Sequence, residues 1–168
     1  EQRAERSPLV TFRVVFEAGS ADDPTGKEGL TRLLADTIAE GGTAELSYEE
    51  LTRRLFPMAA RVSVRVDRDL TVFVGQVHRD HAAAFYPLFR DVLLRPRLAD
   101  EDFRRLRTQA TNALTQELRG NDDERLGQEV LQSVLYQGHP YGHPTLGTER
   151  GLAAITRDDL AAQRARVF

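Results

Sequence analysis

Two pairs of histidines are the residues whose type and spacing could support chemistry by themselves. His139 and His143 stand four positions apart, and His78 and His81 stand three apart. Two histidines four apart on a helix lie on one face and can share a metal ion. The run that carries the first pair, GHPYGHPTLG, contains too much proline and glycine to form that helix. We therefore interpret the first pair as structural loop histidines and the second pair as surface histidines.

Several common catalytic arrangements are absent from the sequence. It contains no cysteine, which excludes thiolate metal ligands, cysteine nucleophiles and disulfide bonds. No serine stands in the glycine-flanked pattern of a nucleophile elbow, and there is no glycine-rich phosphate loop of the P-loop type. A serine hydrolase therefore has no support in this sequence.

The composition is that of a single globular domain with a well-solvated surface. The chain has 168 residues, of which 40% are hydrophobic and 29% are charged, and its net charge is −3. This balance offers no positive field to attract nucleic acid, since the arginines are scattered among acidic residues. No apolar run approaches the roughly 20 residues of a membrane span, and the charged first residues carry no visible secretory signal. We expect neither a nucleic-acid partner nor a membrane span.

The residue pattern predicts the elements that would position a site. Residues 9–18 are rich in β-branched and aromatic side chains and predict a strand, whose nearly continuous apolar run favours burial on both faces. Leucines on one helix face predict a helix over 27–40, which Gly41 and Gly42 end. The later elements are a helix over 47–56 with the capping box Ser47 and Glu50, a hairpin of strands over 61–66 and 70–77, helices near 79–94, 100–119 and 122–136, and a last helix from Thr156.

This order of elements predicts an α+β fold. We expect a small, mainly antiparallel sheet with several helices packed on one face. Three strands are few for a chain of this length, so further strands should lie beyond Phe168 or come from a partner. The domain would then be incomplete at its C-terminus.

Short segments along the chain carry a family resemblance. The first strand is followed by Gly-Ser at 19–20, by a helical segment at 29–36 and by Gly-Thr at 42–43. Further segments follow at 69–73, 93–103, 116–118, 139–142 (His-Pro-Tyr-Gly), 147–148 and 155–160. Together, in this order, they resemble the N-terminal domain of the M16 peptidases, which are zinc metallopeptidases of the insulinase/pitrilysin type.

The resemblance also assigns the positions of a zinc site. In M16 peptidases the first helix carries the inverted motif His-x-x-Glu-His, and a distant Glu completes the coordination. On this chain the first His, the catalytic Glu, the second His and the distant Glu correspond in turn to Arg32, Ala35, Asp36 and Glu117. Only Glu117 keeps the residue type of the family.

These substitutions remove the chemistry of the motif. Arg32 is a permanent cation without a lone pair to donate, so it repels Zn²⁺ where a ligand is needed. Ala35 has no group that could act as a general base. Asp36 and Glu117 alone would make a poor two-carboxylate site. We therefore expect no catalytic residue, no metal and no other cofactor in this chain, although zinc is the cofactor of the family.

The sequence leaves two interpretations of Arg32 open. Arg32 and Asp36 can form an i, i+4 ion pair on a solvated helix face, which contributes a few tenths of a kcal/mol. Alternatively, Arg32 lies against Glu117 as well, so that a salt bridge replaces the metal at the old site.

The resemblance implies a non-catalytic role for this chain. We expect residues 1–168 to be a single M16-like N-terminal domain, a fragment of a longer two-domain subunit. It would assist an active M16 zinc metallopeptidase, or a second copy of itself, by closing a chamber, binding extended peptide substrate at a sheet edge or stabilising the partner. The alternatives are an active zinc metalloendopeptidase whose site another chain completes, and a scaffold without a proteolytic role. Because bacterial members are often periplasmic or secreted, we expect that location.

Overall fold

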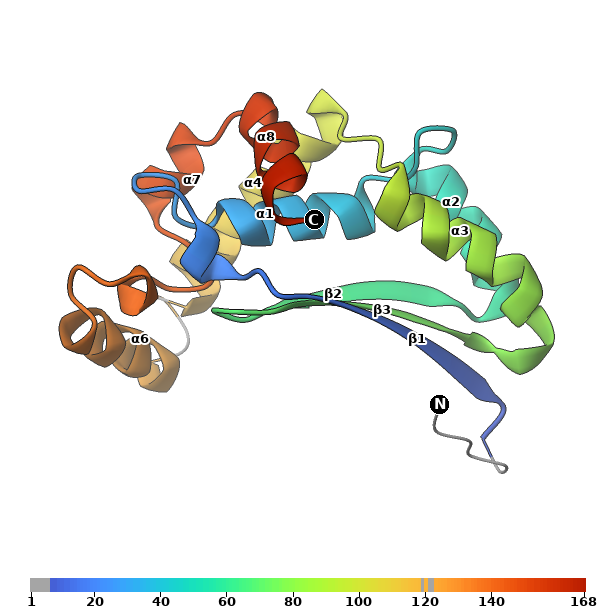
Figure 1. Cartoon of the computed structure of the whole chain (residues 1–168), viewed down its shortest axis with the longest axis horizontal. Coiled ribbons are helices and arrows are strands. Elements are labelled where there is room, and N and C mark those ends of the chain that lie inside the picture. The colour runs from blue at the N-terminus through green and yellow to red at the C-terminus, as the bar shows by residue number, and fades with distance from the viewer. Residues whose placement is uncertain (1–6, 119, 121–122) are drawn as a thin grey trace.

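A three-stranded antiparallel sheet and a layer of helices make up the protein (Figure 1). The computed structural model describes residues 7–118, 120 and 123–168. Its strands are β1 (Leu9–Phe16), β2 (Arg61–Val66) and β3 (Thr71–His78). Its α-helices are α1 (Leu30–Glu40), α2 (Tyr48–Leu55), α3 (Ala82–Leu94), α4 (Asp100–Asn112), α6 (Asp123–Leu135), α7 (Glu149–Ala154) and α8 (Arg157–Val167). The predicted α+β fold is confirmed.

The sheet has the order β1-β3-β2, so the hairpin strand β3 is central and β1 lies at an edge. Burial along β1 alternates strictly between exposed and half-buried residues. The prediction that this strand is buried on both faces is therefore wrong. Among the described residues only one face of the sheet is covered by helices, and Val15, which points to the other face, is 55% exposed. The apolar run in the sequence reflects β-branched side chains that suit a strand on either face.

Aromatic side chains join the covered face of the sheet to the helices. Phe12 in β1 lies opposite Gly75 in β3, and its ring is 6.0 Å from that of Phe85 and 6.2 Å from that of Phe89 in α3. A Cβ atom at Gly75 would lie 2.9 Å from both α3 rings. The glycine therefore permits this close packing of α3 on the sheet, which a larger residue would disrupt.

The helix α1 is the centre of the core. Its predicted apolar face is fully buried, with Leu30, Leu33, Leu34 and Ile38 at most 2% exposed. The helix begins at Leu30 and not at Lys27, because the carboxylate of Asp23 accepts hydrogen bonds from the backbone N–H groups of Gly29 and Thr31, both at 2.7 Å. The preceding residues are thereby held as turns outside the helix.

Several predicted helix boundaries shift in the structure. The helix expected over 79–94 is a 3₁₀ turn (Arg79–His81) followed by α3, and the helix expected over 100–119 is α4 followed by a π-helical segment (Ala113–Leu118). The short helix α7 was not predicted from the residue pattern. The capping box of Ser47 and Glu50 is confirmed, as is the start of the last helix after Thr156.

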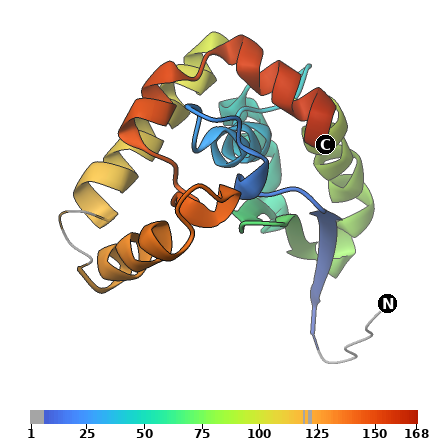
Figure 2. The same cartoon turned by 60° about the vertical axis from the view of Figure 1, so that its left-hand side comes forward.

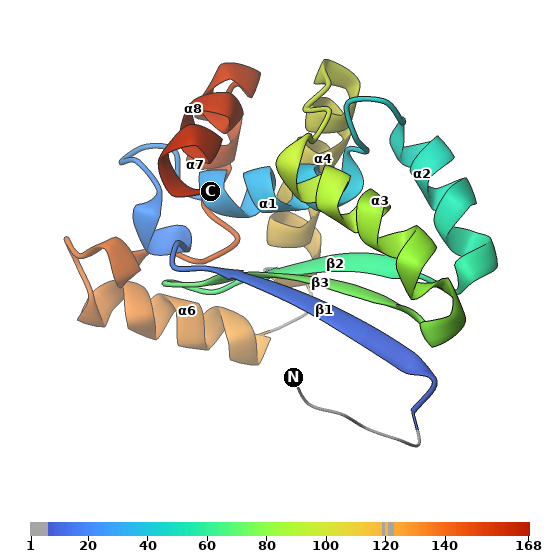
Figure 3. The ribbon, with the colours of Figure 1, turned by 45° about the vertical axis from the view of Figure 1, so that its right-hand side comes forward.

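The C-terminal helix α8 lies across α1, as Figure 2 shows. Gln163 of α8 is buried and donates hydrogen bonds to the hydroxyl of Thr31 at 2.8 Å and to the carbonyl of Asp22 at 3.2 Å. The ring of Phe168 packs 4.7 Å from that of Phe16 on the sheet. Figure 3 shows α1, α3 and α8 above the sheet, whereas α6 lies apart from this layer.

Candidate functional site

A cavity of about 340 Å³ opens beside α1, between it and α4. Four of the lining residues are polar: Arg32, Asp36, Glu40 and Gln109. The apolar part of the wall includes Leu33, Leu106, Ala110, Ala113 and Leu146. Arg32 and Asp36 are two of the positions that the M16 resemblance assigns to zinc ligands, so this cavity is the candidate site.

Arg32 and Asp36 contact each other across one helical turn. Arg32 Nε donates to Asp36 Oδ2 at 2.7 Å, and the two side chains are 31% and 21% exposed. Burial raises the pKa of Asp36 above its ordinary value, and the charge of Arg32 offsets part of that rise. The pair is thus a half-buried ion pair and not the fully solvated one that the simplest interpretation describes.

Ala35 of α1 does not line the cavity. It is fully buried in the hydrophobic core. A methyl group at this position can neither bind a metal nor accept a proton.

Glu117 belongs to the π-helical segment Ala113–Leu118, whose first residue lines the cavity. The side chain of Glu117 lies outside the described residues, so the predicted salt bridge between Arg32 and Glu117 stays a prediction. π-Helical turns occur frequently at functional sites, and this one continues α4 beside the candidate site.

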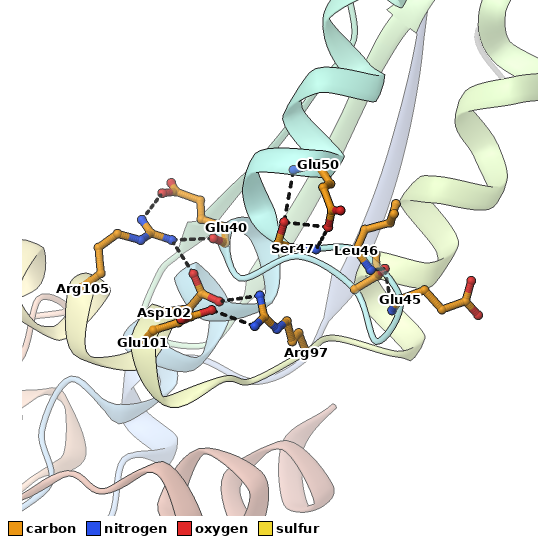
Figure 4. A network of polar contacts seen from close by, with 10 residues as sticks. Glu40, Glu45, Leu46, Ser47, Glu50, Arg97, Glu101, Asp102 and Arg105 are labelled. Carbon is orange, nitrogen blue, oxygen red and sulfur yellow. Dashed lines mark hydrogen bonds and ion pairs between the residues drawn. The ribbon is translucent and has the colours of Figure 1, made fainter.

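Arg105 of α4 contacts the end of α1 at Glu40, which lines the cavity (Figure 4). It donates to the backbone carbonyl of Glu40 at 2.6 Å and to Asp102 at 3.2 Å, and its guanidinium stacks 5.1 Å from the ring of Tyr48. A cation at the last carbonyls of α1 stabilises that helix end. Burial and then the neighbouring charge of Asp36 raise the pKa of Glu40. No pattern in the sequence points to Arg105 and Glu40, because contacts between α1 and α4 depend on the tertiary fold.

The histidine pairs lie in other regions. His139 Nδ1 accepts from the backbone N–H of Tyr141 at 3.1 Å, inside a 3₁₀ turn (Pro140–Gly142). His78 Nδ1 accepts from the N–H of Asp80 at 3.4 Å. These contacts agree with the interpretation as loop and surface histidines. Within residues 7–118, 120 and 123–168, no three His, Asp or Glu side chains are placed to share a metal ion.

The His-Pro-Tyr-Gly loop instead holds other loops in place. The hydroxyl of Tyr141 donates to Asp69, in the turn between β2 and β3, at 2.6 Å. Glu28 accepts from the N–H of Gly26 at 2.7 Å and from the hydroxyl of Thr148 at 3.2 Å. Burial acts to raise the pKa of Glu28, but these hydrogen bonds outweigh it and lower the pKa. We call this region, residues 23–29 and 139–148, the loop junction.

Comparison with protein families identifies the fold. The family model described as insulinase (peptidase family M16) matches residues 2–149. The chain belongs to peptidase family M16. The resemblance drawn from the sequence is thereby confirmed.

Known M16 proteins with solved structures share the fold of this chain. A peptidase M16 inactive domain from Pseudomonas fluorescens superposes with a TM-score of 0.85 at 23% identity, over 96% of this chain and 39% of that one. Pitrilysin superposes with a TM-score of 0.78 at 18% identity, over 96% of this chain and 18% of that one. At these identities the likeness establishes the fold alone.

Two curated relatives are mitochondrial-processing peptidase subunits beta. The probable subunit of Schizosaccharomyces pombe is 25% identical over 155 residues, which is 89% of this chain and 32% of the relative. The subunit of Lentinula edodes is 25% identical over 154 residues, 90% of this chain and 32% of the relative. The chain therefore spans about a third of the length of these relatives.

The predicted periplasmic or secreted location is wrong, since both curated relatives are named as mitochondrial proteins. A cysteine-free domain suits oxidising and reducing compartments alike, so the fold itself gave no support to that prediction. Among the described residues no helix is long and apolar enough to cross a membrane.

The α1 residues at the family's zinc positions do not fit a zinc ion. Arg32 presents only donors to the cavity, and the carboxylate of Asp36 already accepts from Arg32. A zinc site needs three or four lone-pair ligands around one point. Instead, Arg32 can donate hydrogen bonds to a polar ligand, and the carboxylates of Asp36 and Glu40 can accept them.

Proposed function

We propose that this chain is a non-catalytic M16 domain, the N-terminal part of a longer two-domain subunit, which assists an active zinc metallopeptidase of the same family. The observation that carries the proposal is the ion pair of Arg32 and Asp36 at the positions that the family uses for two histidines. Ala35, in the core behind them, supplies no general base.

The assisting role has three components that this fold could supply. The domain closes one side of a chamber, stabilises the catalytic partner, and binds extended substrate segments. The third component is supported by β2, whose outer edge pairs with no strand in the described part of the chain. A free edge offers main-chain N–H and C=O groups to an added strand.

Metal analysis of the purified chain tests the loss of catalysis. We expect less than stoichiometric zinc with or without added Zn²⁺, and no chelator-sensitive cleavage of a quenched fluorescent peptide. Stoichiometric zinc together with chelator-sensitive cleavage would sink the proposal in favour of an active peptidase.

A variant that restores the ligands supplies the positive control. We expect the double substitution Arg32→His and Asp36→His to gain stoichiometric zinc without gaining cleavage, because Ala35 is unchanged. Adding Glu117→Gln to this double variant should weaken zinc binding, since it removes the third ligand of the family pattern. Failure of the double variant to bind zinc would contradict the assignment of these positions.

The assisting role needs its own experiment. Co-expression with an M16 peptidase that carries an intact His-x-x-Glu-His motif, from the same genome, should give a complex with higher cleavage activity than the peptidase alone. Unchanged activity and no complex would favour a scaffold without a proteolytic role.

A further inference from the structure

We propose that the cavity beside α1 binds the uncharged main chain of a polypeptide, with Arg32 donating hydrogen bonds to a backbone carbonyl oxygen. This inference rests on the substrate-binding part of the proposed function and specifies where and how the peptide is held. In this arrangement the guanidinium of Arg32, and not a metal ion, faces the carbonyl group of the bound peptide. A guanidinium can hold that oxygen, but it cannot supply an activated water.

The donors of Arg32 are the first support. A guanidinium carries five N–H donors, and Arg32 uses Nε for Asp36. Within the described residues, its two terminal amino groups make no hydrogen bond and no ion pair within 4.0 Å. The side chain is 31% exposed and lines the cavity, so a ligand there can reach these donors.

The balance of charge selects the kind of ligand. The cavity lining carries charges of both signs: Arg32 pairs with Asp36, and Glu40 lies 3.9 Å from Arg105, which is outside the lining and also pairs with Asp102. A carboxylate ligand would meet repulsion from Asp36 and Glu40, and an ammonium ligand would meet repulsion from Arg32. A neutral amide meets both partners that it needs, because the guanidinium donates to its C=O and a carboxylate accepts from its N–H.

The shape and lining of the cavity agree with a peptide. Its volume of about 340 Å³ lies at the lower end of the range for small-ligand sites. Leu106 and Leu33 are buried parts of its wall, and Ala110 adds a further apolar surface. We therefore expect a short main-chain segment with a small or medium apolar side chain. Gln109 offers an additional amide to the same segment.

Nuclear magnetic resonance of the isotope-labelled chain tests this directly. The probe is a short peptide of Leu, Ala, Ser and Gln, acetylated at its N-terminus and amidated at its C-terminus, so that it carries no charge. The Nε–Hε signal of Arg32 is assigned by its loss in Arg32→Gln. We expect this signal to shift on titration and Arg32→Gln to bind the peptide about tenfold more weakly, the loss typical of a hydrogen bond from a charged donor.

Two further variants exclude a merely structural effect. Arg32→Lys keeps the charge and one set of donors, so it should recover part of the affinity. Arg90→Gln removes an arginine that pairs with Asp91 on the surface of α3, outside the cavity, and should leave the affinity unchanged.

The outcomes separate this inference from the proposed function. In one outcome, the peptide shifts the signals of β2 but not the Nε–Hε signal of Arg32, and it binds Arg32→Gln with the same affinity as the wild type. This outcome overturns the inference and leaves substrate binding at the sheet edge intact. If Glu117 occupies the donors of Arg32, the Arg32 signal will not shift on titration. This outcome also overturns the inference. No binding of the peptide anywhere overturns the inference together with substrate binding, while partner stabilisation is still decided by the co-expression experiment.

Discussion

The candidate cavity and the loop junction differ in how far their residues resemble those of the M16 family. At the cavity, α1 carries residues that differ from the zinc motif, and one ion pair of 2.7 Å stands beside about 340 Å³ of open space. At the loop junction, which borders a cavity of about 500 Å³, Tyr141 of the family-like His-Pro-Tyr-Gly segment is hydrogen-bonded to Asp69, and Thr148 is hydrogen-bonded to Glu28. The family-like loop thus helps to hold the fold together, whereas the loss of the zinc motif that we propose falls where α1 borders the candidate cavity.

The largest effect should come from the close backbone contact in the loop junction. Gly147 has a φ of +85°, and a Cβ atom there would lie 2.3 Å from the carbonyl oxygen of Glu28. We expect Gly147→Ala to destabilise the fold by more than about 3 kcal/mol in urea unfolding, because backbone atoms must move. Gly127→Ala is the matched control: nothing lies within 4 Å of its Cβ position in α6, so it should be neutral or stabilising. Equal stabilities of the two variants would refute the comparison.

The next effect concerns the start of α1, which the loop junction holds. Asp23→Ala removes the acceptor of two backbone N–H groups, those of Gly29 and Thr31. We expect a loss of about 1–3 kcal/mol in the free energy of unfolding, with Asp23→Asn intermediate because its amide oxygen can still accept. Amide hydrogen exchange at Gly29 and Thr31 should accelerate in Asp23→Ala. Unchanged protection of these two amides would contradict the capping role.

A smaller effect is expected at the tyrosine of the His-Pro-Tyr-Gly loop. Tyr141→Phe removes only the hydroxyl that donates to Asp69 at 2.6 Å. The cost should be about 0.5–1.5 kcal/mol, as for a single exposed hydrogen bond. The hydrogen bond also raises the pKa of Tyr141, so the phenol should titrate at lower pH in Asp69→Asn. A phenol whose pKa is the same in both proteins would show that the contact is absent in solution.

The smallest effect, of opposite sign in two regions, should appear in the pH dependence of stability. The folded pKa of Asp36 in the cavity is raised by burial, so its ionised form weakens the fold and stability is regained as pH falls below that pKa. Burial acts to raise the pKa of Asp159 too, but Lys27 and Thr156 outweigh it and lower the pKa. The stability from Asp159 is present above its unfolded pKa and is lost as pH falls through its folded pKa.

Unfolding of Asp36→Asn and Asp159→Asn at several pH values between about 3 and 7 checks these signs. Relative to the wild type, Asp159→Asn should be less stable near neutral pH and equal in acid. Asp36→Asn should lack the wild-type gain on acidification. If the free energy of unfolding depends on pH in the same way in both variants, the opposite signs expected for Asp36 and Asp159 are wrong.

Local patterns decided much of this protein before any tertiary contact was known. The apolar face of α1, the β2–β3 hairpin and the capping box of Ser47 and Glu50 depend on residues two to four positions apart. Such neighbours meet in almost any fold, so their spacing alone predicts the element. The collinear segments that resemble M16 peptidases also come from the sequence, as do the identities of Arg32 and Asp36.

Only the tertiary structure decided which surfaces meet. Helices cover only one face of the sheet among the described residues, which explains why the apolar run of β1 is buried on one face only, and the run itself carries no such information. Arg105 contacts the end of α1 from 65 positions away, and Tyr141 reaches Asp69 across 72. Contacts of this separation depend on how elements pack and not on local preference. The sequence could therefore name Arg32 and Asp36 at the positions that the family resemblance assigns to zinc ligands, but their ion pair and the space around them follow from the fold.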